Sequence, residues 1–378
     1  MVSSGVTVTV PGKIMLAGEY GVLWGAPSLS CALDRTLTVQ AEVREAGSIE
    51  LHSPLWPDPL LTTLTRYGEA AAHEQAAFPL WLQATCAALA CYPQLGLCLR
   101  VSADFPISAG LGSSSALCLA TMLAAASLAG KQRENSLRVE GRPSRSSFAF
   151  ADAQEFFLAA GRQALAVQRS AQGFASGYDI ATQLRGGLVV FRHDEHTWPK
   201  ELRVLPEEAR GALSSLVGIY TAELGGAPTT TVGGAMSRSL IGAGKVAKVC
   251  ALSEEVVAAL LSVFAGAEST LDEISWKRFF LANAELRLIF AEGPAFPQRL
   301  MADLATLPGF DRRWTAKPSG AGGNDGFIVF APVSADREAA HRLLLRHGWQ
   351  RLTYAIAPSW AGARVCSSDT GSVVQEVR

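Results

Sequence analysis

Residues 104–130 read DFPISAGLGSSSALCLATMLAAASLAG, and this stretch constrains the fold of the chain more than any other. Two glycines, Gly110 and Gly112, and three consecutive serines, 113–115, lead directly into an apolar run at 116–129. The run holds only two hydroxyl residues and is shorter than the roughly 20 residues that a membrane-spanning helix needs. It therefore predicts a buried helix that begins at a glycine- and serine-rich turn.

The start of such a helix is suited to binding an anion. Its first amides have no partner within the helix, and the helix dipole places positive charge there. Glycines let the backbone approach a ligand closely, and serine hydroxyls can donate to phosphate oxygens or bind a hard cation such as Mg²⁺. The alternative is that the serines only cap the helix and the glycines only form the turn. The segment fits neither the Walker A pattern nor the G-x-G-x-x-G pattern.

The composition limits the classes of partner. The chain has 378 residues, of which 49% are hydrophobic, and its 33 basic and 34 acidic residues give a net charge of -1. Such a balance provides no field that would attract nucleic acid or an anionic membrane, so a small molecule is the expected partner. The strand-like start, MVSSGVTVTV, lacks the pattern of a secretory signal, and the seven cysteines form no C-x-x-C pair. We therefore expect a cytoplasmic protein with reduced thiols, as a monomer or homodimer.

Hydrophobic periodicity predicts a mixed α+β protein with a boundary near residues 195–205. Strands are expected at VTVTV, TLTVQAEV, LCLRVSADF and GGLVVFR, and helices at FAFADAQEFFLAAGRQALAVQ and SGYDIATQL. The polar segment 131–147 is expected to be a surface excursion between helices. In the second half, LVGIYTA, GFIVFAPV and TYAIAP are expected to be strands, and EVVAALLSVFAGA, WKRFFLANAELRLIF and REAAHRLLLRHGW helices.

Three separated segments carry a family resemblance: PGKIMLAGEYGVLWGAPSLSCAL, PISAGLGSSSA and KPSGAGGNDGFIVF. In this order and spacing they resemble the three motifs of the GHMP kinase superfamily, from Val6 to about Tyr354. The resemblance implies an N-terminal domain at 1–198 with a ribosomal-protein-like α/β fold and a C-terminal ferredoxin-like domain at 199–378. ATP and its acceptor are expected to bind in the cleft between them.

Within the superfamily, the segment AQGFASGYDIATQLRGGLVVF is most similar to phosphomevalonate kinases. This similarity implies transfer of the γ-phosphoryl group of ATP to phosphomevalonate, which gives mevalonate diphosphate for isoprenoid synthesis. Mevalonate kinase, mevalonate diphosphate decarboxylase and another small-molecule GHMP kinase remain alternatives. A protein of a different class, a catalytically silent nucleotide-binding regulator, could also use this fold.

The resemblance also implies roles for two residues. Lys13, expected at the end of the first strand, would stabilise the charge that develops on the transferred phosphoryl group. Asp179 in SGYDIA matches the aspartate assigned as catalytic in related kinases. Lys13 could instead be a solvated surface lysine. Asp179 could instead be the N-cap of the short helix that follows it. A phosphate-monoester acceptor is mostly dianionic at neutral pH, so with phosphomevalonate Asp179 should orient groups and need not accept a proton.

The remaining site residues follow from the same resemblance. The nucleotide is expected at Pro106, Gly110, Leu111, Gly112, Ser113, Ser114 and Ser115, and Mg²⁺ at Ser114. The acceptor is expected at Glu19, Tyr20, Ser176, Gly177, Lys317, Ser319, Gly320, Ala321 and Gly322. Glu19 and Tyr20 could instead form a buried pair that holds a turn, and the late loop could be a plain hairpin. Gln168 occupies the spacing at which mevalonate kinases supply a glutamate, so no protein carboxylate is assigned to the metal.

Overall fold

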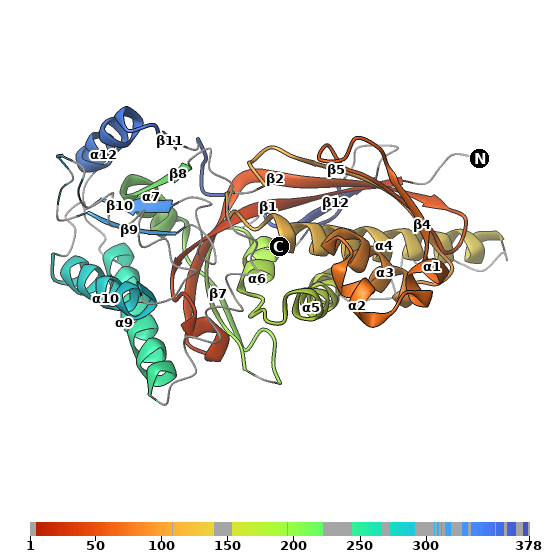
Figure 1. The fold of residues 1–378 in the computed structure, drawn as a ribbon, viewed down its shortest axis with the longest axis horizontal. Helices are drawn as coiled ribbons and strands as arrows, with labels where there is room; N and C mark the ends of the chain where they lie inside the picture. The colour runs from red at the N-terminus through yellow and green to blue at the C-terminus, as the bar shows by residue number, and fades with distance from the viewer. Residues whose placement is uncertain are drawn as a thin grey trace.

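A large sheet, antiparallel except for the parallel pairing of its third and fifth strands, forms one part of the computed structural model (Figure 1). The structure describes residues 5–107, 109–139, 153–194, 196–221, 244–265, 273–291, 306, 308–309, 311, 314–318, 327–331, 334–351, 353–358, 361–367 and 373–376. Within these ranges the sheet has nine strands in the order β13-β12-β1-β2-β5-β3-β4, and β6 joins β2 to β7. Its strands are β1 (Gly5–Ala17), β2 (Ser28–Arg44), β3 (Ser48–His52), β4 (Leu60–Thr63), β5 (Gly96–Ala103), β6 (Leu188–Arg192), β7 (Glu201–Val204), β12 (Arg364–Ser367) and β13 (Val373–Glu376).

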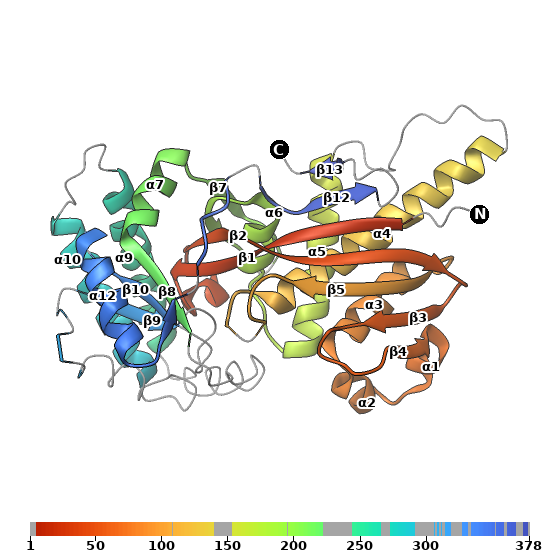
Figure 2. The ribbon, with the colours of Figure 1, turned by 90° about the horizontal axis from the view of Figure 1, so that it is seen from above.

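Helices cover one face of this sheet. α3 (Leu80–Cys91), α4 (Ser113–Val139) and α5 (Ala153–Gln172) pack against one another, and α4 packs on β1 and β2 (Figure 2). The alternation of VTVTV sends Val6, Val8 and Val10 into this core, where all three are fully buried. The first 198 residues also form four short helices: η1 (Gly21–Trp24), α1 (Leu64–Glu69), α2 (Ala72–Ala77) and α6 (Tyr178–Arg185).

A second, four-stranded antiparallel sheet has the order β11-β8-β10-β9. Its strands are β8 (Val217–Thr221), β9 (Thr315–Pro318), β10 (Phe327–Phe330) and β11 (Gln350–Arg351). In Figure 1 it lies between α12 (Ser334–Arg346) and the packed pair α9 (Lys245–Ala265) and α10 (Glu273–Ala291), with α7 (Glu207–Leu216) beside it. The α+β fold class expected from the sequence is therefore confirmed.

The division into domains at residue 198 stays a prediction. β7, β12 and β13 follow that residue, yet all three belong to the large sheet. The chain therefore returns from the small sheet to the first one, and β12 pairs with the first strand of the protein, β1.

Helix α4 is the buried helix that the apolar run predicts, but it is longer than expected. It continues to Val139, so the prediction of a surface excursion from residue 131 is wrong for 131–139. Lys, Gln, Arg, Glu and Leu in this segment are good helix formers, and polarity alone does not end a helix. Residues Ser113–Arg133 are long and apolar enough to cross a membrane by length and composition, but 78% of an apolar 18-residue stretch within them is buried inside the protein, as in a core helix.

The final strand is also not where the sequence predicts it. Residues 353–358 form only an isolated bridge, between Leu33 and Ile356, and the last strands are β12 and β13. The segment hydrogen-bonds to the chain on both sides of Leu33, through Asp34 N to Ala355 O at 2.8 Å and Ala357 N to Ala32 O at 2.9 Å. This segment therefore connects the small sheet to the large one. Its last residue, Pro358, lacks an N–H donor and so cannot extend a strand pairing.

Candidate active site

The glycine-rich loop connects β5 to α4 and takes the conformation that only glycine adopts easily. Gly110 has a φ of 71° and Gly112 a φ of 81°, both in the left-handed region. A Cβ atom on Gly112 would lie 2.7 Å from Cε of Lys13 and 3.1 Å from Nε2 of Gln183. Two hydrogen bonds to the rest of the protein hold the loop in place. Leu111 O accepts from Lys13 N at 2.8 Å, and Gly112 O accepts from Gln183 Nε2 at 3.0 Å. The glycines therefore serve both the turn and the close approach of Lys13.

The three serines at the start of α4 have different surroundings. Ser113 Oγ donates to Ile107 O at 2.9 Å, and the buried Ser115 Oγ donates to Gly112 O at 2.9 Å. Ser114 is partly exposed, and its hydroxyl makes no hydrogen bond to the part of the chain that the structure describes. The backbone amides of 113–115 likewise receive no acceptor from the described residues. The helix start thus offers three amides and one hydroxyl to a ligand.

Lys13 lies inside β1, whereas the sequence predicted it at the end of the strand. The strand continues to Ala17, and its register shifts between Pro11 and Lys13. The side chain of Lys13 is only 4% exposed, so it is not a solvated surface lysine. Its Nζ donates to the Tyr178 hydroxyl at 3.0 Å and to Gly110 O at 3.4 Å, and it lies 5.2 Å from the centroid of the Tyr178 ring. A cation is thus held directly against the glycine loop.

Asp179 lies in the first turn of α6 and does not cap the helix. Gly177, with a φ of 80°, is the N-cap residue, so the N-cap interpretation of Asp179 is wrong. Oδ1 of Asp179 accepts from Ile180 N at 2.9 Å, and Oδ2 accepts from Nε2 of the buried Gln168 at 3.5 Å. Gln168 therefore contacts the carboxylate of Asp179. It stands at the spacing where mevalonate kinases supply a glutamate, so this position offers an amide and no carboxylate.

Tyr178 accepts a hydrogen bond from Lys13 and directly precedes Asp179, and it was not among the residues expected in the site. Burial raises the pKa of its hydroxyl, the nearby Lys13 ammonium lowers it, and the Asp179 carboxylate raises it. Lys13 thus faces a neutral phenol as its hydrogen-bond acceptor. The available signal was the position of Tyr178 directly before Asp179, on the same first turn of a helix.

Lys317 of the small sheet forms a buried ion pair with Glu19, which lies in the turn that follows β1. Lys317 Nζ, in β9, contacts a carboxylate oxygen of Glu19 and donates to Met15 O of β1 at 2.6 Å. Burial lowers the pKa of Lys317 well below its usual value, and the charge of Lys13 lowers it further. Lys317 is 2% exposed, so its ammonium group is directed into the protein next to the site.

Of the other expected acceptor residues, Tyr20, Ser176 and Gly177 are described by the structure, and those of the late loop are not. Tyr20 has a φ of 59°, and burial raises its pKa, with a further contribution from Tyr178. Ser176 is 4% exposed, and a Cβ atom on Gly177 would lie 2.4 Å from Nε1 of Trp198. The glycine-rich late loop, with Ser319, Gly320, Ala321 and Gly322, lies outside the described residues.

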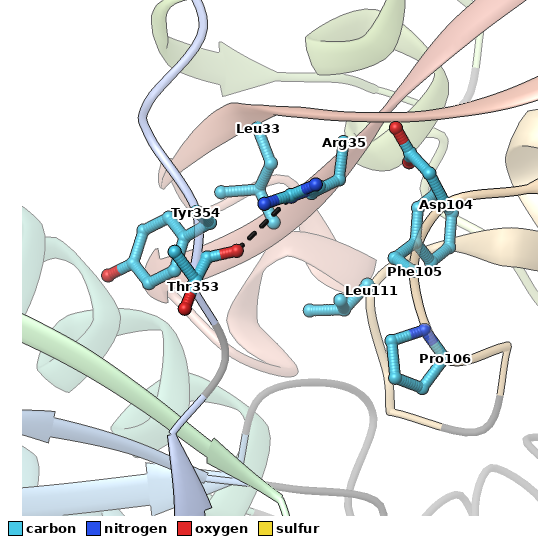
Figure 3. A pocket seen from close by; sticks show the side chains of 8 residues that line it. All are labelled: Leu33, Arg35, Asp104, Phe105, Pro106, Leu111, Thr353 and Tyr354. Carbon is cyan, nitrogen blue, oxygen red and sulfur yellow. Dashed lines mark hydrogen bonds between the residues drawn. The ribbon is translucent and has the colours of Figure 1, made fainter.

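A cavity of about 80 Å³ lies against the glycine loop (Figure 3). On one side it is lined by the segment that follows β5, which includes Pro106, and on the other by β2 and the segment that crosses between the sheets. Arg35 Nε donates to Thr353 O at 3.1 Å across it. The lining residues are Leu33, Arg35, Asp104, Phe105, Pro106, Leu111, Thr353 and Tyr354.

Comparison with known proteins finds a family to which part of this chain is similar. Residues 81–142, which include the glycine loop and the whole of α4, match the model of the GHMP kinases N terminal domain. The chain is 31% identical over 137 residues to a mevalonate kinase of Thermococcus sibiricus, and 30% identical over 135 residues to one of Pyrococcus abyssi. These alignments cover 33% and 32% of this chain, and 39% and 38% of the length of the two relatives.

Solved structures share the fold over nearly the whole chain. A mevalonate kinase of Methanococcus jannaschii matches with a TM-score of 0.64 at 18% identity, covering 93% of this chain and 98% of the other. A phosphomevalonate kinase of Streptococcus pneumoniae, solved with phosphomevalonate and AMPPNP, matches with a TM-score of 0.62 at 14% identity, covering 93% and 99%. At these identities the likeness establishes the fold alone.

Proposed function

Because the chain has the N-terminal domain and the fold of the GHMP kinases, we propose that it uses ATP to phosphorylate a small molecule of the mevalonate pathway. The observation that carries this proposal is the contact of the buried Lys13 ammonium with Gly110 O of the glycine loop and with the Tyr178 hydroxyl, directly before Asp179. A fixed cation beside an anion-binding helix start is what phosphoryl transfer requires. The seven cysteines are free thiols, which supports a cytoplasmic enzyme.

In the proposed site, the amides of 113–115 bind the phosphates of ATP, and Lys13 contacts the phosphoryl group in transfer. The uncommitted Ser114 hydroxyl fits a ligand of Mg²⁺, which when bound neutralises the charge of the phosphates. Because Gln168 replaces an acid here, the remaining metal ligands would be phosphate oxygens and water, in agreement with the reluctance of Mg²⁺ to lose its water shell.

For the acceptor we propose phosphomevalonate. The segment that contains α6 is most similar to phosphomevalonate kinases, and Asp179 is held by Ile180 N and Gln168 as expected for an orienting group. Mevalonate is the second candidate, because the relatives with about 30% identity are mevalonate kinases. The two acceptors differ in chemistry, since a hydroxyl must lose its proton during transfer and a phosphate dianion need not.

The Asp179→Asn variant tests the role of the carboxylate. If the acceptor is a phosphate monoester, turnover should fall by less than about 100-fold, the smallest contribution typical of a general base. A loss of about 10⁴-fold with unchanged acceptor binding would favour a hydroxyl acceptor that needs Asp179 as its base. Turnover and KM of purified enzyme are measured, and thermal unfolding verifies that the variant folds.

The direct test of the reaction is ³¹P NMR of the protein with ATP, Mg²⁺ and either mevalonate or phosphomevalonate. We expect a new diphosphate signal and ADP with phosphomevalonate only. A phosphomonoester formed from mevalonate would identify a mevalonate kinase, and release of CO₂ from mevalonate diphosphate a decarboxylase. Absence of ADP with a broad panel of acceptors, while ATP still binds, would contradict the enzyme proposal and favour a nucleotide-binding regulator.

A further inference from the structure

Three potential metal ligands meet on the face of the large sheet opposite the helices. Glu50 and His52 lie on β3 and Cys98 on β5, and their ligand atoms are all within 4.8 Å of one another. His52 Nε2 and Glu50 Oε1 are 2.6 Å apart. Around a tetrahedral Zn²⁺, ligand atoms at about 2.0–2.3 Å from the metal are about 3.3–3.8 Å from one another. Small side-chain movements are therefore enough to reach this geometry.

The strand register makes this meeting a property of the fold. β3 and β5 pair in parallel, and Glu50 stands directly opposite Cys98. His52 is two residues after Glu50, so its side chain leaves the same face of the sheet. The intervening residues Leu51 and Leu99 are fully buried in the core on the other face. Backbone hydrogen bonds thus hold the three donor groups together.

The three donors combine accessibility with the ligand chemistry of zinc. The side chains of His52 and Glu50 are 30% and 29% exposed, and the Cys98 thiol is buried beside them. Thiolate, imidazole and carboxylate together favour Zn²⁺ over Mg²⁺ or Ca²⁺, which bind mainly oxygen. Water can occupy the fourth position from the solvent side.

The charges around the cluster allow a divalent cation. A bound Zn²⁺ would be neutralised by the carboxylate of Glu50 and the thiolate of Cys98. The nearby guanidinium of Arg44 is 3.4 Å from Glu50 Oε2, but it also pairs with Glu42 at 3.0 Å and can keep that partner. Burial raises the pKa of the Cys98 thiol, so zinc binding has to release the thiol proton to solvent.

We propose that Glu50, His52 and Cys98 form a Zn²⁺ site that joins β3 to β5. The site is independent of the proposed kinase reaction, because β3 and β4 lie at the end of the molecule away from the small sheet (Figure 2). A metal here would fasten the outer strands β3 and β4 to β5. The bound metal therefore acts on stability, with no part in phosphoryl transfer.

Metal titration of the full chain tests this site. The protein is freed of metal with a chelator and titrated with Co²⁺, whose complex with a thiolate has a characteristic charge-transfer absorption, and then with Zn²⁺. We expect one metal ion per chain, the thiolate band with Co²⁺, its loss when Zn²⁺ displaces Co²⁺, and a higher thermal unfolding temperature with Zn²⁺. Absence of stoichiometric binding by the folded protein would overturn the proposal.

Variants separate this site from adventitious binding. Removing a group that only hydrogen-bonds to a metal ligand costs about 10–100-fold in metal affinity. Removing a ligand itself should cost more, so Cys98→Ser, His52→Ala and Glu50→Gln should each weaken Zn²⁺ binding at least about 100-fold. Cys91→Ser and His73→Ala, at an exposed free thiol and an exposed imidazole, should bind like the unaltered protein. Circular dichroism verifies the fold of each variant. A Co²⁺–thiolate band that survives Cys98→Ser but disappears in Cys91→Ser would refute the assignment.

Discussion

At the scale of single residues, the three serines at the start of α4 perform different tasks. Ser113 and Ser115 hold the loop through carbonyl groups, and Ser114 has its hydroxyl available. The sequence alone offered two roles for these serines, helix capping and phosphate binding. It could not show which of the three has which role, because they are identical neighbours. The division depends on where the loop carbonyls of Ile107 and Gly112 lie, which is a matter of backbone conformation.

Ser115→Ala should therefore affect stability, and Ser114→Ala should affect nucleotide binding. Removing the buried Ser115 hydroxyl should lower the free energy of unfolding by about 1 kcal/mol, and Ser114→Ala should leave it unchanged. A hydrogen bond to a charged group contributes about 1.5–3 kcal/mol, so Ser114→Ala should weaken binding of Mg·ATP about tenfold or more. Urea unfolding and nucleotide titration measure the two quantities. Equal nucleotide affinity in Ser114→Ala and the unaltered protein would contradict the proposed role of Ser114.

Lys13 should be the residue on which turnover depends most. A preorganised donor to developing negative charge is worth about 100–1000-fold in kcat, so Lys13→Met should lose about this factor. Methionine keeps much of the buried side chain, so the fold should persist. Lys200→Met, which changes a lysine that is 58% exposed, is the control and should keep full activity. Initial rates with saturating substrates make the comparison, and a loss below about threefold in Lys13→Met would exclude the electrostatic role.

At the scale of elements, the β5–loop–α4 unit was predictable because its signals are local. Gly110 and Gly112 occupy left-handed conformations, and the apolar run became the core helix. The end of α4 and the last strands were not predictable in this way. Residues 131–139 are polar but helical, and 353–358 look like a strand yet cross between two sheets, because their partners near Leu33 are far away in sequence.

The Gly112→Ala variant tests the contact between the loop and Lys13. The left-handed backbone should cost about 1–2 kcal/mol, and the new methyl group would displace Lys13, whose Cε lies 2.7 Å from its position. A misplacement of this kind is expected to lower turnover about 100-fold. Gly47→Ala has a similar φ of 76° and no atom within 4 Å of its Cβ position, so it should lose stability without losing turnover. Equal turnover in both variants would contradict the account.

At the scale of the whole molecule, the two sheets are joined through the buried pair of Glu19 and Lys317. This pair could not be read from the sequence. Lys317 and its carbonyl partner Met15 are 302 residues apart, and no local pattern reports a contact between β9 and β1. The sequence placed Glu19 and Lys317 in the acceptor site through family resemblance, and the structure adds that they contact each other.

A double-mutant cycle should measure this connection. Glu19→Gln leaves the buried Lys317 without its counter-charge and should destabilise the protein by about 3–5 kcal/mol. Glu19→Gln/Lys317→Met should be more stable than the sum of the single variants predicts. Glu285→Gln breaks the exposed pair of Lys248 and Glu285, whose side chains are 54% and 50% exposed, and should cost at most about 1 kcal/mol. Strict additivity of Glu19→Gln and Lys317→Met in urea unfolding would show that the buried pair does not couple the sheets.

A crystal structure with a non-hydrolysable ATP analogue, Mg²⁺ and phosphomevalonate tests the central claim most directly. We expect the triphosphate on the amides of 113–115, with Lys13 Nζ at a hydrogen-bond distance of about 2.7–3.2 Å from an oxygen of the γ-phosphate. Asp179 should face the acceptor beside it. A nucleotide bound elsewhere, or Lys13 and Asp179 turned away from the terminal phosphorus, would contradict the account.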